Sequence, residues 1–272
     1  MAKENLQGIA DTLYIPLVAR ISVSKQFPDF FCDEKALSLE SSIPEKWKHI
    51  MEAAKEYENM AAVARYFNFD DMTRKFMAAH ERCNIVNLGA GLDTGFHRLQ
   101  PTKAVFYEVD LPEVIDVRRK VLGEHDGEVL LGGDMFDLSW ATAIDCTLPT
   151  LLMASGVFQY FPHARLHGFI RDLKKTFPKG ELAFDATTRI GIEVANYYVR
   201  RLGNRDAHMP FYINSSKAFA RKTDTVLMEN RPFFTDLRRI LGPRLKRSTR
   251  FLTFWGDLLN MSRVIHLKLN AK

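Results

Sequence analysis

The chain has 272 residues, of which 46% are hydrophobic and 26% are charged. These are ordinary values for a soluble globular protein, which can bury a sizeable core without disulfides or metals. The length suffices for one large α/β domain with an elaborated cap, or for two small domains. A formal net charge of +5 and a pI near 9.0 can favour an acidic substrate, although surface lysine and arginine explain them more simply.

The three cysteines, Cys32, Cys83 and Cys146, stand far apart in the sequence. Their spacing gives neither a disulfide framework nor a zinc motif, so we expect a reducing compartment and no bound metal. The N-terminus lacks the basic flank and the small-residue cleavage site of a signal peptide. No apolar run approaches the roughly 20 residues that a transmembrane helix needs. The sequence therefore predicts a cytoplasmic protein.

Residues 1–80 are predicted to be mainly helical. Beyond them, short β-rich runs alternate with helical segments, a pattern typical of βαβ units and of a largely parallel sheet. Strands are predicted at residues 84–88, 104–109, 128–131, 150–154 and 181–187. Helices are predicted at 112–122 and 162–177, each with a proline near its start, where a missing N–H group costs little.

The alternation ends after Thr187. Residues from 189 to about 240 form a long stretch rich in aromatic residues and arginine. A segment of that length between strands is usually a lid or a substrate-specificity element. Two β-like runs, around 246–254 and 263–269, then close the chain. The segment that joins them contains Gly256 and favours an antiparallel pair at one edge of the sheet.

Residues 84–94, NIVNLGAGLDT, carry the strongest functional signal. Ligands of open α/β sheets bind beyond the carboxyl ends of the strands. The first turn there needs residues without side chains, so that the backbone approaches the ligand and its N–H groups face it. Gly89 and Gly91 meet this need, although a plain glycine turn would look the same. A dinucleotide fingerprint requires a third glycine where Thr94 stands, so the turn favours a nucleoside-like cofactor without phosphates.

Acidic residues follow the next two predicted strands. Asp110 ends the second strand, where a carboxylate can accept hydrogen bonds from ribose hydroxyls. The same side chain can instead cap the helix that begins at Pro112. Asp134 follows the third strand and can accept from an adenine amino group, with Met135 against the ring. Because Gly-Gly-Asp is also ordinary turn chemistry, this second assignment is weak on its own.

The combination of NLGAGLDT, YEVDLP, GD-x-x-DL at residues 133–138 and LLMASGVFQYF resembles the leucine carboxyl methyltransferase superfamily. Within it the chain is most similar to bacterial polyketide O-methyltransferases of the tetracenomycin type. The resemblance implies an α/β, Rossmann-like class I methyltransferase fold. Its seven-stranded, mostly parallel sheet would have an antiparallel final strand pair. An N-terminal helical cap, 1–80, would precede a cofactor-binding domain, 81–272, with a lid insertion at about 189–240.

The same resemblance implies S-adenosylmethionine as the cofactor. It matches Asp110 to the ribose, Asp134 and Met135 to the adenine, and Arg65 to the carboxylate of the cofactor. Ser155 stands where most members have a glutamate, and a serine cannot supply a negative charge. The residues assigned to cofactor binding are Arg20, Arg65, Gly89, Ala90, Gly91, Asp110, Asp134, Met135 and Ser155.

Two functions remain open at this point. The first is O-methylation of a carboxyl or hydroxyl group on a small, polyketide-like or otherwise acidic molecule. A carboxylate needs no general base and a phenol does; since no His–Asp pair is visible, the carboxyl group is favoured. Tyr197, Tyr198 and Arg201 can hold such a substrate, unless they are helix surface and core. The alternative is a non-catalytic or regulatory relative with weakened cofactor binding. We assign no catalytic residue and expect neither a nucleic acid nor a membrane as partner.

Overall fold

The computed structural model describes the backbone of residues 2–201 and 209–271, and the side chains of residues 13–49, 54–196 and 209–271. The strands are β1 (Cys83–Leu88), β2 (Ala104–Asp110), β3 (Glu128–Gly132), β4 (Thr150–Ala154), β5 (Gly180–Thr187), β6 (Val226–Pro232) and β7 (Ser262–Lys268). The α-helices are α1 (Ala2–Gln26), α2 (Glu34–Ser38), α3 (Glu45–Ala53), α4 (Glu56–Ala79), α5 (Gly95–Leu99), α6 (Pro112–Leu122), α7 (His163–Thr176), α8 (Arg189–Arg201), α9 (Ser216–Lys222), α10 (Thr235–Leu241) and α11 (Arg247–Leu258).

The strands form one sheet in the order β3-β2-β1-β4-β5-β7-β6. The first five run parallel, and β7 lies antiparallel between β5 and β6. The chain builds outward from β1 to β3 and then returns to place β4 on the other side of β1. Open α/β sheets bind their ligands at such a reversal of strand order.

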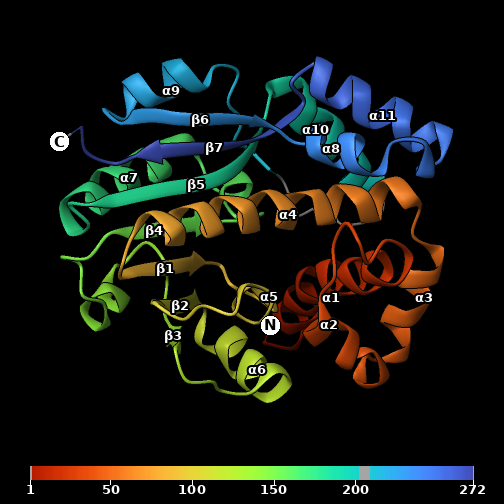
Figure 1. Ribbon diagram of the computed structural model, residues 1–272, viewed down its shortest axis with the longest axis horizontal. Helices are drawn as coiled ribbons and strands as arrows, with labels where there is room; N and C mark the ends of the chain where they lie inside the picture. The colour runs from red at the N-terminus through yellow and green to blue at the C-terminus, as the bar shows by residue number, and fades with distance from the viewer. Residues whose placement is uncertain (1, 202–208, 272) are drawn as a thin grey trace.

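Helices cover both faces of the sheet, and Figure 1 shows α4 lying across the front one. Successive residues of a strand point to opposite faces. Ile85 packs in a cluster with Met60 and other residues of α4, whereas Val86 packs on the other face with Leu166 and its neighbours on α7. Since β1 is covered on both faces, it is buried along its whole length and reads as a nearly continuous apolar run.

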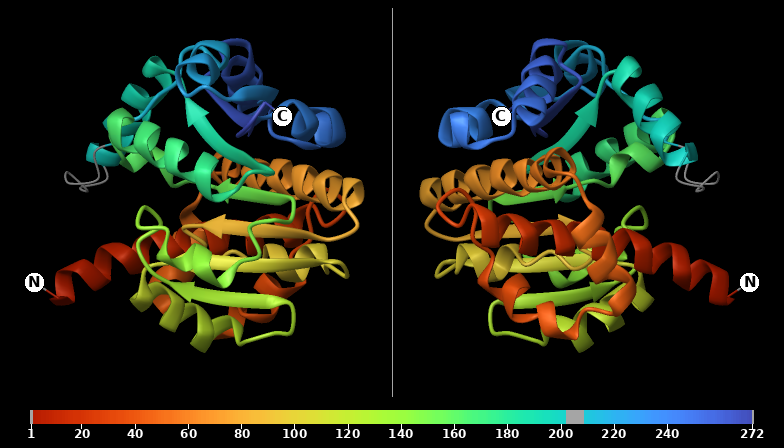
Figure 2. Two further views of the ribbon diagram at one scale, coloured as in Figure 1. Left: turned by 90° about the vertical axis from the view of Figure 1, so that its left-hand side faces the viewer. Right: turned by 90° about the vertical axis from the view of Figure 1, so that its right-hand side faces the viewer.

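The N-terminal residues are helical, as predicted. Trp47 of α3 and Leu17 of α1 share a core cluster with Val114 of α6, which ties these helices to the edge of the sheet. Figure 2 shows the start of α1 extending away from the rest of the molecule. The division at residue 80 and the lid function of residues 189–240 remain predictions. No helix in the described part of the chain is long and apolar enough to cross a membrane.

The predicted sheet is confirmed, but one of its strands is misplaced. Residues 246–254 do not form a strand, because most of this segment belongs to α11. The strand that pairs with β7 is β6, which lies inside the stretch predicted as a lid. β6 is an edge strand with Arg231 as its one buried residue, so it lacks the apolar alternation that predicts strands. In α11 the buried residues are Thr249, Thr253 and Gly256, at helical spacing.

Candidate functional site

A cavity of about 550 Å³ lies at the carboxyl ends of β1, β2 and β4. Its wall includes the turn at residues 89–93, the end of β2 at Asp110, and residues 155–157 after β4. Side chains from α1 and α4 complete it, among them Arg20 and Arg65. The N-terminal helices therefore close a site whose floor is the sheet.

The glycine turn adopts backbone angles that favour glycine. Gly89 and Gly91 have φ angles of +71° and +50°. A Cβ atom at Gly89 would lie 2.5 Å from Cγ2 of Val157, so the close approach here is to the segment after β4. The N–H groups of Gly89 and Ala90 donate to the carbonyl of Val109, at 2.8 and 3.2 Å. The prediction that these N–H groups face a ligand is therefore wrong for both, because the sheet already uses them.

Asp110 holds the same turn and also lines the cavity. Its Oδ2 accepts the N–H of Gly91 at 2.8 Å, and its Oδ1 accepts the N–H of Leu111 at 2.7 Å. Burial raises the pKa of Asp110, and these two N–H groups act in the opposite direction. The N-cap of α6 is Leu111, so the alternative interpretation, in which Asp110 caps this helix, is wrong. Each carboxylate oxygen keeps a lone pair for a hydroxyl group of a ligand.

Arg65 reaches the cavity from α4. Its Nη2 pairs with Oδ2 of Asp185 at 3.1 Å, and Oδ1 of Asp185 accepts the N–H of Gly156 at 2.6 Å. A Cβ atom at Gly156 would lie 2.8 Å from Nη1 of Arg65, so glycine makes room for the guanidinium. Nε of Arg65 is buried and has no hydrogen-bond partner among the described residues, whereas the side chain as a whole is 26% exposed and lines the cavity. The exposed part of the guanidinium can therefore meet an anion.

Arg20 fixes the turn to the N-terminal helices. Its side chain is 1% exposed and lies with its guanidinium 4.5 Å from the centre of the Tyr66 ring. Nε pairs with Asp33 at 2.9 Å, and Nη2 donates to the carbonyl of Leu92 at 2.6 Å. Arg20 thus lines the cavity while its Nε and Nη2 are already bound, and these two contacts make it a positioning residue for the turn.

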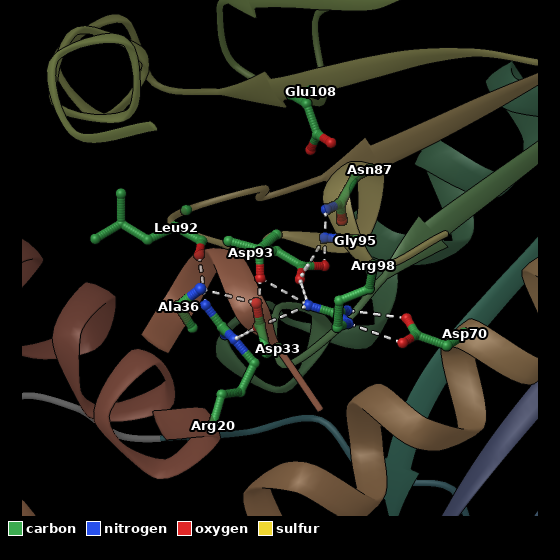
Figure 3. A network of polar contacts seen from close by, with 12 residues as sticks. Arg20, Asp33, Ala36, Asp70, Asn87, Leu92, Asp93, Gly95, Arg98 and Glu108 are labelled. Atoms are coloured by element: carbon green, nitrogen blue, oxygen red, sulfur yellow. Dashed lines mark hydrogen bonds and ion pairs between the residues drawn. The ribbon is translucent and has the colours of Figure 1, made fainter. Parts of the chain in front are cut away.

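Figure 3 shows a network of ion pairs behind the turn, with Arg98 at its centre. Nε and Nη2 of Arg98 donate to the two carboxylate oxygens of Asp70, at 2.8 and 2.9 Å. Nη1 contacts Asp93 at 3.0 Å and Asp33 at 3.2 Å. Burial opposes the charge of Arg98, but the three carboxylates raise its pKa well above the usual value. Arg98 therefore stays charged and holds the chain after the turn, although burial raises the pKa of Asp70.

A second buried arginine, Arg118, supports the turn from α6. Its Nη1 donates to the carbonyls of Gly91 and Asp93, at 3.1 and 2.6 Å. Its Nη2 lies 2.7 Å from Glu128 and 3.2 Å from Glu108. Burial raises the pKa of Glu108 to about 8; Arg118 lowers it, and Glu128 and Asp93 raise it further. Burial therefore favours the protonated form of Glu108 at neutral pH.

The structure does not bring every predicted cofactor residue to the cavity. Ser155 lines it, but Asp134 and Met135 do not. The side chain of Asp134 is half exposed and pairs with Arg165 at 3.2 Å. Met135 is buried in the core of the sheet. The side chains of the predicted substrate residues, Tyr197, Tyr198 and Arg201, lie outside the described residues.

Sequence reasoning missed several residues of the site. Asp185 lies in β5, two residues before the strand ends at Thr187, and reaches the cavity wall through Gly156 and Arg65, so the strand-end rule does not single it out. Asp33, Asp70 and Arg98 gave no local signal either, because they come from separate helices and loops and meet only in the fold.

One further group lies outside the cavity. In the part of the chain that the structure describes, His97, His125 and Glu128 place possible metal-ligand atoms within 4.8 Å of one another. Arg118 already donates to Glu128 and supplies the positive charge that this carboxylate needs. The sequence-based expectation of no bound metal therefore stays a prediction.

Comparison with known proteins shows which protein family the chain matches. A family model described as leucine carboxyl methyltransferase matches residues 9–173. The tetracenomycin polyketide synthesis O-methyltransferase TcmP of Streptomyces glaucescens is 27% identical over 193 residues, which are 71% of each chain. A putative S-adenosyl-L-methionine-dependent methyltransferase of Mycobacterium bovis (strain BCG / Pasteur 1173P2) is 33% identical over 110 residues, which are 36% of each chain.

Solved structures confirm the predicted fold. A DUF574 family protein from Streptomyces avermitilis MA-4680 matches with a TM-score of 0.53 at 13% identity, covering 92% of this chain and 96% of its own. Magnesium protoporphyrin IX methyltransferase (ChlM) from Synechocystis PCC 6803, crystallised with bound SAH, matches with a TM-score of 0.51 at 12% identity, covering 87% and 99%. The resemblance stated from the sequence motifs is confirmed as well. The chain belongs to the leucine carboxyl methyltransferase family.

Proposed function

We propose that this protein transfers a methyl group from S-adenosylmethionine to an oxygen atom of a small acidic molecule. The observation that carries the proposal is the cavity wall, which combines the Asp110 carboxylate, the Arg65 guanidinium and the glycine turn. A cofactor with a ribose diol and an amino-acid carboxylate needs an acceptor and a cation in such positions. The volume of about 550 Å³ is typical of small-molecule sites.

A carboxyl group lies close to Ser155, which stands where most members of the family have a glutamate. Asp185 accepts the N–H of Gly156, the residue that follows Ser155, and pairs with Arg65. We infer that Asp185 takes over part of the role of that glutamate. S-adenosylmethionine supplies an electrophilic methyl group when bound, and the contribution of the chain is to orient the two reactants and exclude water.

A carboxyl group is the acceptor that this cavity favours. None of the described residues that line it is a histidine, so a histidine base for a phenol is not among them. A carboxylate is anionic at neutral pH and needs no such base. The relationship to TcmP supports a polyketide-like acid as the substrate.

A non-catalytic or regulatory relative is the second candidate. It is favoured by Ser155 and by the ion pair of Arg65 with Asp185, which the carboxylate of a cofactor would have to share. Methyl transfer to any small acid would exclude this candidate.

The test is a screen of carboxylic and phenolic acids with S-adenosylmethionine, read by mass spectrometry as the gain of one methyl group. Asp110→Asn should raise the KM for the cofactor by roughly fivefold to a hundredfold, since it disturbs about 1–3 kcal/mol of polar contact. Asp134→Asn is the matched control, because Asp134 does not line the cavity. Equal effects of the two variants would contradict the assignment of Asp110. Cofactor binding without transfer to any acid would favour the regulatory candidate.

A further inference from the structure

α11 turns its apolar side toward solvent. The residues that it buries are Thr249, Thr253 and Gly256. Its outward side and the residue that follows the helix, Leu259, carry large apolar side chains that are 41–62% exposed: Phe251, Leu252, Phe254, Trp255, Leu258 and Leu259. A surface helix of a globular protein normally has its apolar stripe on the inner side. A contiguous apolar surface of this kind marks an interaction site.

The orientation of α11 is fixed by contacts on its inner side. Asp257 accepts the N–H of Phe234 at 2.9 Å and pairs with Arg238 at 2.8 Å. A Cβ atom at Gly256 would lie 3.1 Å from the ring of Phe234, so the small residue allows close packing on α10 and the segment before it. The helix therefore docks without its apolar residues, which remain free for another surface.

Unpaired cations border the apolar side. Lys246, Arg247 and Arg250 are exposed, and none of them forms an ion pair with a carboxylate among the residues that the structure describes. The acidic residue of the helix, Asp257, faces inward and is already bound. A groove of about 600 Å³ between α10 and α11 combines Arg247 and Arg250 with the rings of Phe251 and Phe254. Cations beside aromatic and aliphatic groups match the phosphate and acyl parts of a lipid.

We propose that α11 docks this protein onto an anionic membrane surface, with lipid phosphates at Arg247 and Arg250. A second copy of the chain fits this surface less well, because a twofold contact would bring the unpaired cations of both copies together. Nucleic acid fits less well too, because half of the exposed apolar residues, Leu252, Leu258 and Leu259, offer no platform for base stacking beside the three aromatic rings. The sequence-based expectation of no membrane partner considered only spanning segments. Figure 1 places α11 at the end of the sheet opposite α6, where nothing covers its outer side within the described residues.

Tryptophan fluorescence can detect this docking directly. The chain has three tryptophans. Trp47 and Trp140 are 4% exposed, whereas Trp255 is 41% exposed, so a change of environment at α11 dominates the signal. With vesicles of equal parts phosphatidylglycerol and phosphatidylcholine, we expect a blue shift of the emission and cosedimentation of the protein. Both should weaken with phosphatidylcholine alone and at high salt, since each basic residue near an anionic surface contributes roughly fivefold to the affinity.

Two double variants separate the charged and apolar contributions. Arg247→Glu with Arg250→Glu should lower vesicle affinity by more than about tenfold. Phe251→Ser with Leu258→Ser should abolish the blue shift. Met228→Ser on β6 is the matched control, because Met228 is also apolar and 52% exposed, and it should change neither readout.

Three results would overturn the proposal. The first is no cosedimentation with the anionic vesicles. The second is a blue shift that depends on protein concentration without vesicles, accompanied by a dimer in sedimentation velocity. The third is a blue shift with single-stranded nucleic acid and none with vesicles.

Discussion

Replacing Glu108 with glutamine tests whether this buried carboxyl group, behind the glycine turn, is protonated in the folded chain. Burial raises the pKa of Glu108 to about 8, with Arg118 lowering it and Glu128 and Asp93 raising it. A carboxyl group with a raised pKa binds its proton more tightly in the folded chain. Its contribution to stability is therefore complete below the unfolded pKa, near 4.5, and is lost as the pH rises through about 8. Glutamine keeps the shape of the protonated acid and cannot ionise.

The size of the effect follows from this window. Each pH unit between the two pKa values changes the free energy of unfolding by roughly 1.4 kcal/mol. Between about pH 5.5 and about pH 7.5, the wild-type chain should lose about 2.5 kcal/mol relative to Glu108→Gln. Urea unfolding of both proteins at the two pH values measures this difference. Comparing the two proteins cancels the pH dependence of all other groups.

Glu113→Gln serves as the control, because Glu113 is exposed on α6 and should shift stability equally at both pH values. If the stability of Glu108→Gln relative to the wild type is the same at both pH values, Glu108 is ionised in the folded chain. The conclusion that burial favours the protonated form of Glu108 would then be wrong.

Three further changes probe the turn and the cavity. Gly89→Ala places a Cβ atom 2.5 Å from Val157 at a φ of +71° and should lower the free energy of unfolding in urea by about 1–3 kcal/mol. Adding Val157→Ala should restore only part of this loss, and an unchanged free energy of unfolding in Gly89→Ala would refute the packing argument. Arg98→Met leaves Asp70 without its buried cation and should lower the free energy of unfolding by about 3–5 kcal/mol. A loss below about 1 kcal/mol would mean that water solvates the network. Arg65→Lys should weaken S-adenosylhomocysteine binding about tenfold or more in calorimetry and leave methylthioadenosine, which lacks the carboxylate, unchanged; equal losses would place Arg65 elsewhere.

The central part of the site was predictable because local rules place it. A buried strand followed by a glycine turn puts its carboxyl end at the ligand-binding edge of an α/β sheet, and Gly89, Gly91 and Asp110 follow from that alone. The rule does not reach Asp185, which lies two residues before the end of β5. The strand-end rule does not say which N–H groups of the turn are hydrogen-bonded to the neighbouring strand. The hydrogen bonds to the carbonyl of Val109 were therefore not predicted.

The supporting networks depend on contacts that no local pattern records. Arg98 meets Asp70 from α4 and Asp33 from the N-terminal region only after the chain has folded. The error at residues 246–254 has a different cause. Periodicity shows which residues share a face, but not whether that face is buried. In α11 the small residues Thr249 and Thr253 are inside and the aromatic residues are outside, the reverse of the usual assumption.

Calorimetric titration with S-adenosylmethionine tests the central claim most directly. The account predicts one saturable site per chain for the wild-type protein and a weaker site in Asp110→Asn, because Asp110 lines the cavity and carries free lone pairs. It also predicts that S-adenosylhomocysteine competes for that site. Absence of binding at about 1 mM cofactor would contradict the account, because it would mean that the binding free energy is weaker than about −4 kcal/mol.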